Sequence, residues 1–161
     1  MAHPYYSSGN PRFNHVAMSL PADLLGADSR ADILRFFKEV LGFDEMPVMT
    51  EDRHRLILSC VHWDQFIFLI NEDDPMRCPR MDHYGFAVYS LDDLKGIQER
   101  AEGFRKTDDR MELIDLHVDD QKMVKIHSHY VRYILPMTLE FQYGEFPESA
   151  EAASAATAAA V

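Results

Sequence analysis

An internal repeat constrains the fold of this chain more than any other feature. Residues 14–18 (Asn-His-Val-Ala-Met) match residues 82–86 (Asp-His-Tyr-Gly-Phe) at an offset of 68 positions. Each copy is followed by a helical pattern of apolar residues that ends in a Gly-Phe pair, over residues 28–43 and 90–104. A unit of about 65 residues that occurs twice is not a solenoid array. We therefore expect two related modules.

Each helical pattern is followed by three runs of β character. These runs cover residues 45–51, 55–62 and 65–71 in the first half, and 111–118, 122–133 and 137–143 in the second. Each half therefore has the order strand–helix–strand–strand–strand. The sequence predicts an α+β domain over residues 12–146, made of two paired βαβββ modules at 12–74 and 80–146.

The segments outside the modules have different compositions. Residues 72–79 form a linker, because their two prolines and their run of charges stop regular structure. Residues 1–11 have an irregular pattern. Residues 147–161 are an alanine-rich tail of low complexity, and a short alanine-rich helix without packing is marginal in water. We predict that this tail carries no chemistry.

Composition excludes several classes of function. The 161 residues suit one domain, and a hydrophobic content of 47% is sufficient for a core. The net charge of −11 argues against a nucleic-acid partner. No apolar stretch approaches the ~20 residues of a membrane span, and no secretory signal is visible. Because the two cysteines also lack zinc-site spacing, we expect a cytoplasmic protein.

Three residues in apolar, strand-like runs form a candidate metal site. His15 and His83 occupy matching positions of the repeat, and Glu140 lies in the last β run. Two imidazoles and one carboxylate form the facial triad that holds a divalent metal and leaves coordination positions open. Fe(II) is the favoured metal, and Mn, Ni, Zn and Co are also compatible. Aligning the last runs of the two halves puts Phe68 opposite Glu140, so a fourth ligand is missing.

These features resemble the vicinal oxygen chelate superfamily over about residues 12–146. The resemblance rests on four segments: Phe-Asn-His-Val-Ala at 13–17, Phe-Phe-Lys-Glu-Val-Leu-Gly-Phe at 36–43, Asp-His-Tyr-Gly-Phe-Ala-Val at 82–88, and residues 131–141. The superfamily includes glyoxalase I, methylmalonyl-CoA epimerase, extradiol dioxygenases, fosfomycin-inactivating transferases and bleomycin-binding proteins. It implies a curved mixed sheet that encloses a cleft, a metal in that cleft, and a homodimer. The modules can pair within one chain or between two chains.

The missing fourth ligand makes the chain resemble extradiol dioxygenases more than glyoxalases. Tyr130 lies ten residues before Glu140, as a tyrosine of the extradiol enzymes does. The acid–base histidine of that signature is absent at 121–123, so His127 and His129 are the candidates for its role. Strand alternation puts those two histidines on one face and Tyr130 on the other. We expect a small catechol-like or enol-like substrate to be activated together with O2.

Aromatic residues near the last run of the first half could line the substrate pocket; they are Trp63, Phe66 and Phe68. His54, His62 and His117 are assigned no role. Two other functions remain open. One is a lyase, isomerase or transferase that uses a redox-inert metal as a Lewis acid. The other is a ligand-sequestering, resistance-type binding protein in which the metal is incidental.

Overall fold

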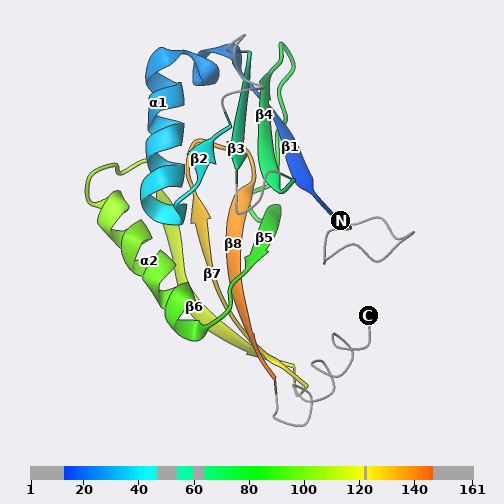
Figure 1. Cartoon of the computed structure of the whole chain (residues 1–161), viewed down its shortest axis with the longest axis vertical. Helices are drawn as coiled ribbons and strands as arrows, with labels where there is room; N and C mark the ends of the chain where they lie inside the picture. The colour runs from blue at the N-terminus through cyan, green and yellow to red at the C-terminus, as the bar shows by residue number, and fades with distance from the viewer. Residues whose placement is uncertain (1–12, 47–53, 60–63, 122, 147–161) are drawn as a thin grey trace, which may run out of the picture.

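The computed structural model describes residues 13–46, 54–59, 64–121 and 123–146. They form two four-stranded mixed sheets (Figure 1). Sheet A has the order β1-β4-β3-β2, from His15–Leu20, Phe66–Asn71, Arg55–Ser59 and Asp44–Glu45. Sheet B has the order β5-β8-β7-β6, from His83–Ala87, Thr138–Glu145, Lys125–Arg132 and Glu112–Asp120. The two identical orders confirm the α+β class and the paired βαβββ pattern.

The strand registers also confirm the residue-by-residue alignment of the two halves. In sheet A, β1 runs parallel to β4 and Ala17 lies opposite Phe68. In sheet B, β5 runs parallel to β8 and Gly85 lies opposite Glu140. Because Ala17 and Gly85 are equivalent in the repeat, Phe68 occupies the position of Glu140. The position equivalent to Glu140 is therefore apolar in the first module.

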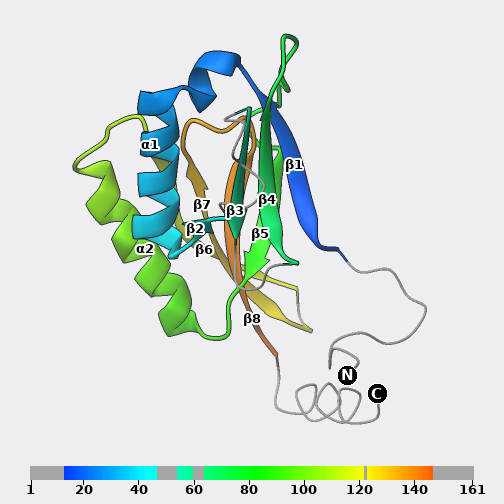
Figure 2. The same ribbon diagram turned by 45° about the horizontal axis from the view of Figure 1, so that its top comes forward.

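Two helices cover one side of the sheets. Helix α1, Ala27–Phe36, continues into a π-helical turn η2, Phe37–Leu41, which ends at Gly42 with a left-handed φ of 73°. Helix α2, Leu91–Arg105, begins after Ser90, whose hydroxyl accepts a hydrogen bond from the Asp93 amide at 3.0 Å. Figures 1 and 2 show both helices on the left of the molecule, with most of the strands to their right. The sequence does not predict the π turn or the short 3-10 helix η1, Ala22–Leu25.

The two modules are joined through an aromatic cluster on their helical side. The Phe36 ring lies 5.4 Å from Phe104 and 4.9 Å from Tyr133, measured between centroids. All three side chains are buried. Burial of large apolar surfaces is the main favourable term in folding, so this cluster fixes one module against the other.

A buried carboxylate adds a polar connection at the same place. Asp108 accepts hydrogen bonds from the Tyr133 hydroxyl at 2.6 Å and from the Arg35 guanidinium at 3.0 Å. Arg110 binds both Asp108 and, at 2.6 Å, Asp32 of helix α1. The Arg110 guanidinium, helped by Tyr133, holds the pKa of Asp108 well below its usual range. The Asp108 carboxylate at this joint therefore stays ionised at all ordinary pH values.

Several sequence predictions lie outside the described residues. They are the flanks at 1–11 and 147–161, parts of two β runs at 47–51 and 60–62, residue 122 and Trp63. Residues 72–79 carry neither helix nor strand. The division into one domain with an irregular N-terminal segment and an alanine-rich tail stays a prediction. None of the described helices has the length and apolar character needed to cross a bilayer.

Candidate active site

The second module brings two of the three predicted ligands together. His83 begins β5 and Glu140 lies on the neighbouring strand β8. The His83 Nε2 atom is 3.3 Å from Glu140 Oε2, and the two side chains are 40% and 8% exposed. Gly85 lies directly opposite Glu140, and a Cβ atom there would stand 3.4 Å from Oε2. Glycine at this position thus leaves space beside the carboxylate.

Neighbouring groups orient both side chains. The His83 Nδ1 atom is 2.8 Å from the Met81 carbonyl oxygen. A carbonyl only accepts, so His83 donates from Nδ1 and turns Nε2 toward Glu140. The Tyr130 hydroxyl donates to Glu140 Oε1 at 2.6 Å, which leaves Oε2 available. This bond to Glu140, followed by burial, raises the pKa of Tyr130 and keeps its phenol protonated.

His15 lies apart from this pair. Its ring is exposed, stacks on Phe66 with a centroid distance of 4.8 Å, and places Nδ1 2.7 Å from Asn14 Oδ1. Donation from Nδ1 leaves Nε2 available, as in His83. Across the described ranges, no cluster of three or more His, Cys, Asp or Glu side chains could share a metal ion. One chain therefore assembles His83 and Glu140 but does not add His15.

A histidine that sequence reasoning left without a role lies beside Tyr130. The His117 ring stacks on the Tyr130 ring at 5.6 Å with an interplanar angle of 11°. Its Nε2 atom is 3.2 Å from the Ser128 hydroxyl oxygen. An irregularity in the β6–β7 register between Ile114 and His117 sets this placement. A register shift of this kind leaves no clear signal in the sequence.

His127 and His129 lie on the other face of sheet B. His129 is fully buried, with Nε2 3.3 Å from the Leu94 carbonyl oxygen, and burial lowers its pKa. His127 Nε2 binds Glu145 Oε2 at 2.9 Å. Side chains alternate along β7, so the face that carries Tyr130 excludes both histidines. Neither reaches Glu140 within the chain, and an acid–base role there is not retained.

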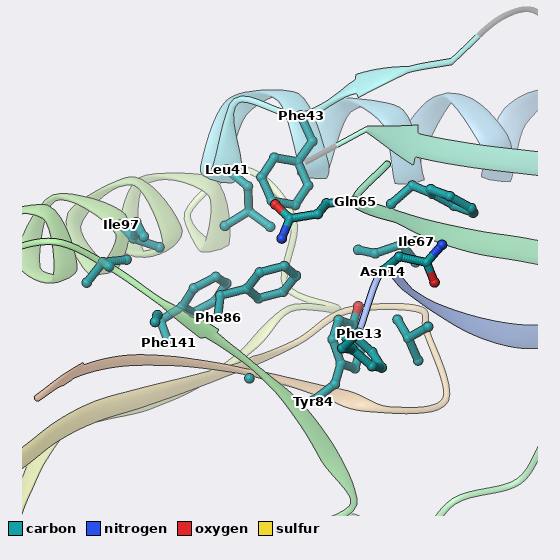
Figure 3. Close-up of a pocket in the computed structure, with 15 residues that line it drawn as sticks. Phe13, Asn14, Leu41, Phe43, Gln65, Ile67, Tyr84, Phe86, Ile97 and Phe141 are labelled. Carbon is teal, nitrogen blue, oxygen red and sulfur yellow. The ribbon is translucent and has the colours of Figure 1, made fainter. Parts of the chain in front are cut away.

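An apolar cavity of about 480 Å³ lies between the modules. Figure 3 shows aromatic side chains from both modules around it, including Phe13, Phe43 and Phe86, with amide groups from Asn14 and Gln65. Phe66, one of the predicted pocket residues, lines this cavity. Phe68 does not line it and is half-buried in sheet A, and Trp63 lies outside the described residues.

Comparison with solved structures identifies the fold. A putative glyoxalase family protein from Bacillus anthracis matches with a TM-score of 0.57 and 20% identity, over 87% of this chain and 100% of that one. Lactoylglutathione lyase from Agrobacterium tumefaciens matches with a TM-score of 0.57 and 12% identity, over 84% and 95%. The fosfomycin resistance protein FosX from Listeria monocytogenes gives 0.56 and 11%, over 85% and 96%. The chain has the vicinal oxygen chelate fold.

No family model and no curated protein matches the chain by sequence. At identities of 20% or less, the likeness to these vicinal oxygen chelate structures establishes the fold. It does not establish the reaction, because one fold carries many chemistries. The residues of the site must therefore carry the functional argument.

Proposed function

We propose that the chain is a divalent-metal-dependent enzyme that acts on a small substrate with vicinal oxygen atoms. One observation carries the proposal. His83 Nε2 and Glu140 Oε2 converge at 3.3 Å, while the other polar atoms of both side chains are engaged by Met81 and Tyr130. Metal-binding histidines and carboxylates in proteins are held by outer partners in this way.

The residues fit a divalent metal. Imidazole nitrogen and carboxylate oxygen are ligands of Fe, Mn, Ni, Zn and Co alike. A bound metal would lower the pKa of a coordinated substrate hydroxyl and draw electron density from it. Tyr130 stands beside Glu140 with its phenol protonated, where it can orient or donate to a substrate oxygen. His117, stacked on Tyr130, holds that ring in place.

The third ligand, His15, comes from a second copy of the chain in this proposal. Within one chain the modules are fixed to each other on their helical side, through Phe36 and Asp108. Strands β1 and β5 are the terminal strands of their sheets, and each begins with an exposed histidine. A twofold homodimer would bring β1 of one copy to β5 of the other, in two equivalent places.

Two reaction classes are compatible with this site. The first is an oxidoreductase of the dioxygenase type, with Fe(II), O2 and a catechol-like or enol-like substrate. Two features favour this class. Tyr130 lies beside the carboxylate ligand Glu140, and the apolar Phe68 occupies the position where a fourth ligand would stand, which leaves coordination positions open. The second is a Lewis-acid lyase, isomerase or transferase, favoured by the fold neighbours described as a lyase and a fosfomycin resistance protein. Substrate-dependent O2 uptake separates the two.

The apolar cavity supports a different class, a ligand-sequestering binding protein. Its volume of about 480 Å³ lies within the range of small-molecule pockets. Under this function, His83→Ala and Glu140→Ala would leave ligand affinity unchanged.

Metal content and subunit mixing test the proposal. Elemental analysis of anaerobically purified protein should find about one metal per chain, and His83→Ala and Glu140→Ala should each weaken metal binding by two orders of magnitude or more. His127→Ala, on the other face of sheet B, is the matched control and should bind metal normally. His15→Ala should fail to bind metal as completely as Glu140→Ala.

Mixing decides whether the site is shared between copies. When His15→Ala and Glu140→Ala proteins are unfolded, combined in equal amounts and refolded, about a quarter of the sites should recover metal in a twofold dimer. A site within one chain would recover none. A parent protein without metal after reconstitution would overturn the enzyme proposal and favour the binding protein.

A further inference from the structure

Arg132 is a cation without a partner among the described residues on the open face of sheet B. It ends β7 and lies two residues from Tyr130, on the same face of the strand. Its side chain is half-buried, and no hydrogen bond or ion pair joins it to any other residue that the structure describes. A partly desolvated guanidinium carries five donors, and leaving them unmatched costs free energy.

The nearest carboxylate in the strand register is already engaged. Glu112 lies directly opposite Arg132 in the β6–β7 pairing. The Glu112 Oε2 atom binds the Arg80 guanidinium at 2.6 Å instead. One carboxylate thus lies near two guanidinium groups and pairs with only one of them, so the site around Arg132 has an excess positive charge in a chain whose net charge is −11.

The position of Arg132 relates this charge to the candidate metal ligands. Residues two apart on a strand are about 7 Å apart on the same face, and Tyr130 pairs with Glu140. Arg132, Tyr130 and Thr138 line a common depression, and Thr138 lies opposite His83 in the β5–β8 register. Arg132 also lines an open cleft of about 530 Å³ between the two modules, together with Ile134 and Pro136. A ligand can therefore approach the guanidinium from solvent.

We propose that Arg132 is an anion subsite of the active site, which makes the substrate a small acid. The chelating oxygens of such a substrate would lie at His83 and Glu140, and its carboxylate, phosphonate or phosphate group would lie about 7 Å away on Arg132. Arginine suits this role because its planar fork binds two oxygens of an oxyacid at once. The position of the subsite rests on the proposed metal site, but its affinity for an anion does not.

The first test uses metal-free, full-length protein, so it does not depend on the metal. The arginine Nε–Hε signals of ¹⁵N-labelled protein are followed by NMR while inorganic phosphate is added. The Arg132 signal should move and saturate. The phosphate-induced shifts of the backbone amides around residue 132, followed in the same titration, should disappear in Arg132→Gln and persist in part in Arg132→Lys. Arg105→Gln, at the exposed end of α2, is the matched control and should leave the response intact. An Arg132 signal that does not respond to phosphate overturns the subsite.

The second test asks whether the subsite serves the metal site. Calorimetry on Mn(II)-loaded protein compares protocatechuate with catechol, which has the same vicinal oxygens but no carboxylate. The parent protein should bind the acid at least about tenfold more tightly, and Arg132→Gln should abolish that preference without changing its affinity for catechol. An equal affinity of the parent protein for the two probes overturns the proposal. A phosphate response at Arg132 in a protein that binds no metal would instead sink the proposed function and leave an isolated anion site.

Discussion

The open faces of the two sheets differ in chemistry although their strands have the same order. One row across sheet B consists of Gly85, Glu140 and Tyr130. The equivalent row across sheet A consists of Ala17, Phe68 and Ile57. The helical sides of both sheets are packed, and in sheet B that side also holds the buried His129. The open sides differ, so a module can carry or lack chemistry there without a change of fold.

Breaking the joint between the modules should give the largest effect. Asp108→Asn removes the buried charge to which the Tyr133 hydroxyl and the partly exposed guanidinium groups of Arg35 and Arg110 donate, and we expect the free energy of unfolding to fall by about 3 kcal/mol because several charge-assisted hydrogen bonds weaken together. Urea denaturation at pH 7 measures this loss. Asp109→Asn, at the exposed neighbouring position, is the control and should change stability by less than about 0.5 kcal/mol.

The pH dependence of this effect has a defined sign. Because the folded-state pKa of Asp108 is lowered, its contribution is fully present above the unfolded-state pKa and is lost as the pH falls toward the folded-state value. The difference between the parent and Asp108→Asn should stay constant from pH 5 to 8 and shrink below about pH 4. A difference that is still undiminished at pH 3 would show that Asp108 is not held ionised.

Removing the hydroxyl of Tyr130 should make the row in sheet B more like that in sheet A. Tyr130→Phe frees Glu140 Oε1 from its donor, and loss of an outer partner of a ligand typically weakens metal binding by about 10- to 100-fold. Metal affinity measured by competition with a chelator tests this, and Tyr143→Phe on the opposite face of sheet B is the control. Unchanged affinity would mean that Tyr130 does not orient the carboxylate.

Adding a carboxylate to sheet A should make its row of residues more like the row in sheet B. Phe68→Glu places a fourth ligand at the position equivalent to Glu140, and we expect metal to bind about tenfold more tightly because one more charged donor is available. Turnover should fall, since one open coordination position is closed. Phe68→Gln, which lacks the charge, controls for the change in shape. A metal affinity equal to that of the parent protein would show that residue 68 lies outside the metal site.

The smallest effect should come from exchanging glycine and alanine between the two rows. Gly85→Ala puts a methyl group 3.4 Å from Glu140 Oε2, where it crowds the ligand, and should lower metal affinity by only a few-fold. Ala17→Gly is the matched change in sheet A and should leave metal affinity as it is. Equal effects of both changes would show that backbone flexibility, rather than space at Glu140, decides the outcome.

Much of the fold can be predicted from the sequence because its signals are local or periodic. The offset between His15 and His83, two helical patterns and six β runs give the order of strands and helix along each module, whereas the order of the strands across each sheet comes from the structure. The equivalence of Phe68 and Glu140 follows from the same repeat, and the strand registers confirm it.

The candidate site is less predictable because it depends on pairings between strands. Alternation along β7 separates Tyr130 from His127 and His129, as expected, but the sequence does not show which face is open. The placement of His117 depends on a register shift, and the missing partner of Arg132 within the described residues depends on a competing arginine, Arg80. These properties arise from geometry between segments far apart in the chain.

The π-helical turn η2 has a genetic consequence. A π turn holds one residue more than an α turn, and η2 ends at Leu41, which lines the apolar cavity together with Phe43. Deleting one residue within 37–40 would remove the extra residue that the wide turn absorbs and restore the α-helical period. Phe43 would then keep its direction toward the cavity. The turn is therefore a place where the gene can lose one codon in frame while the cavity keeps its shape.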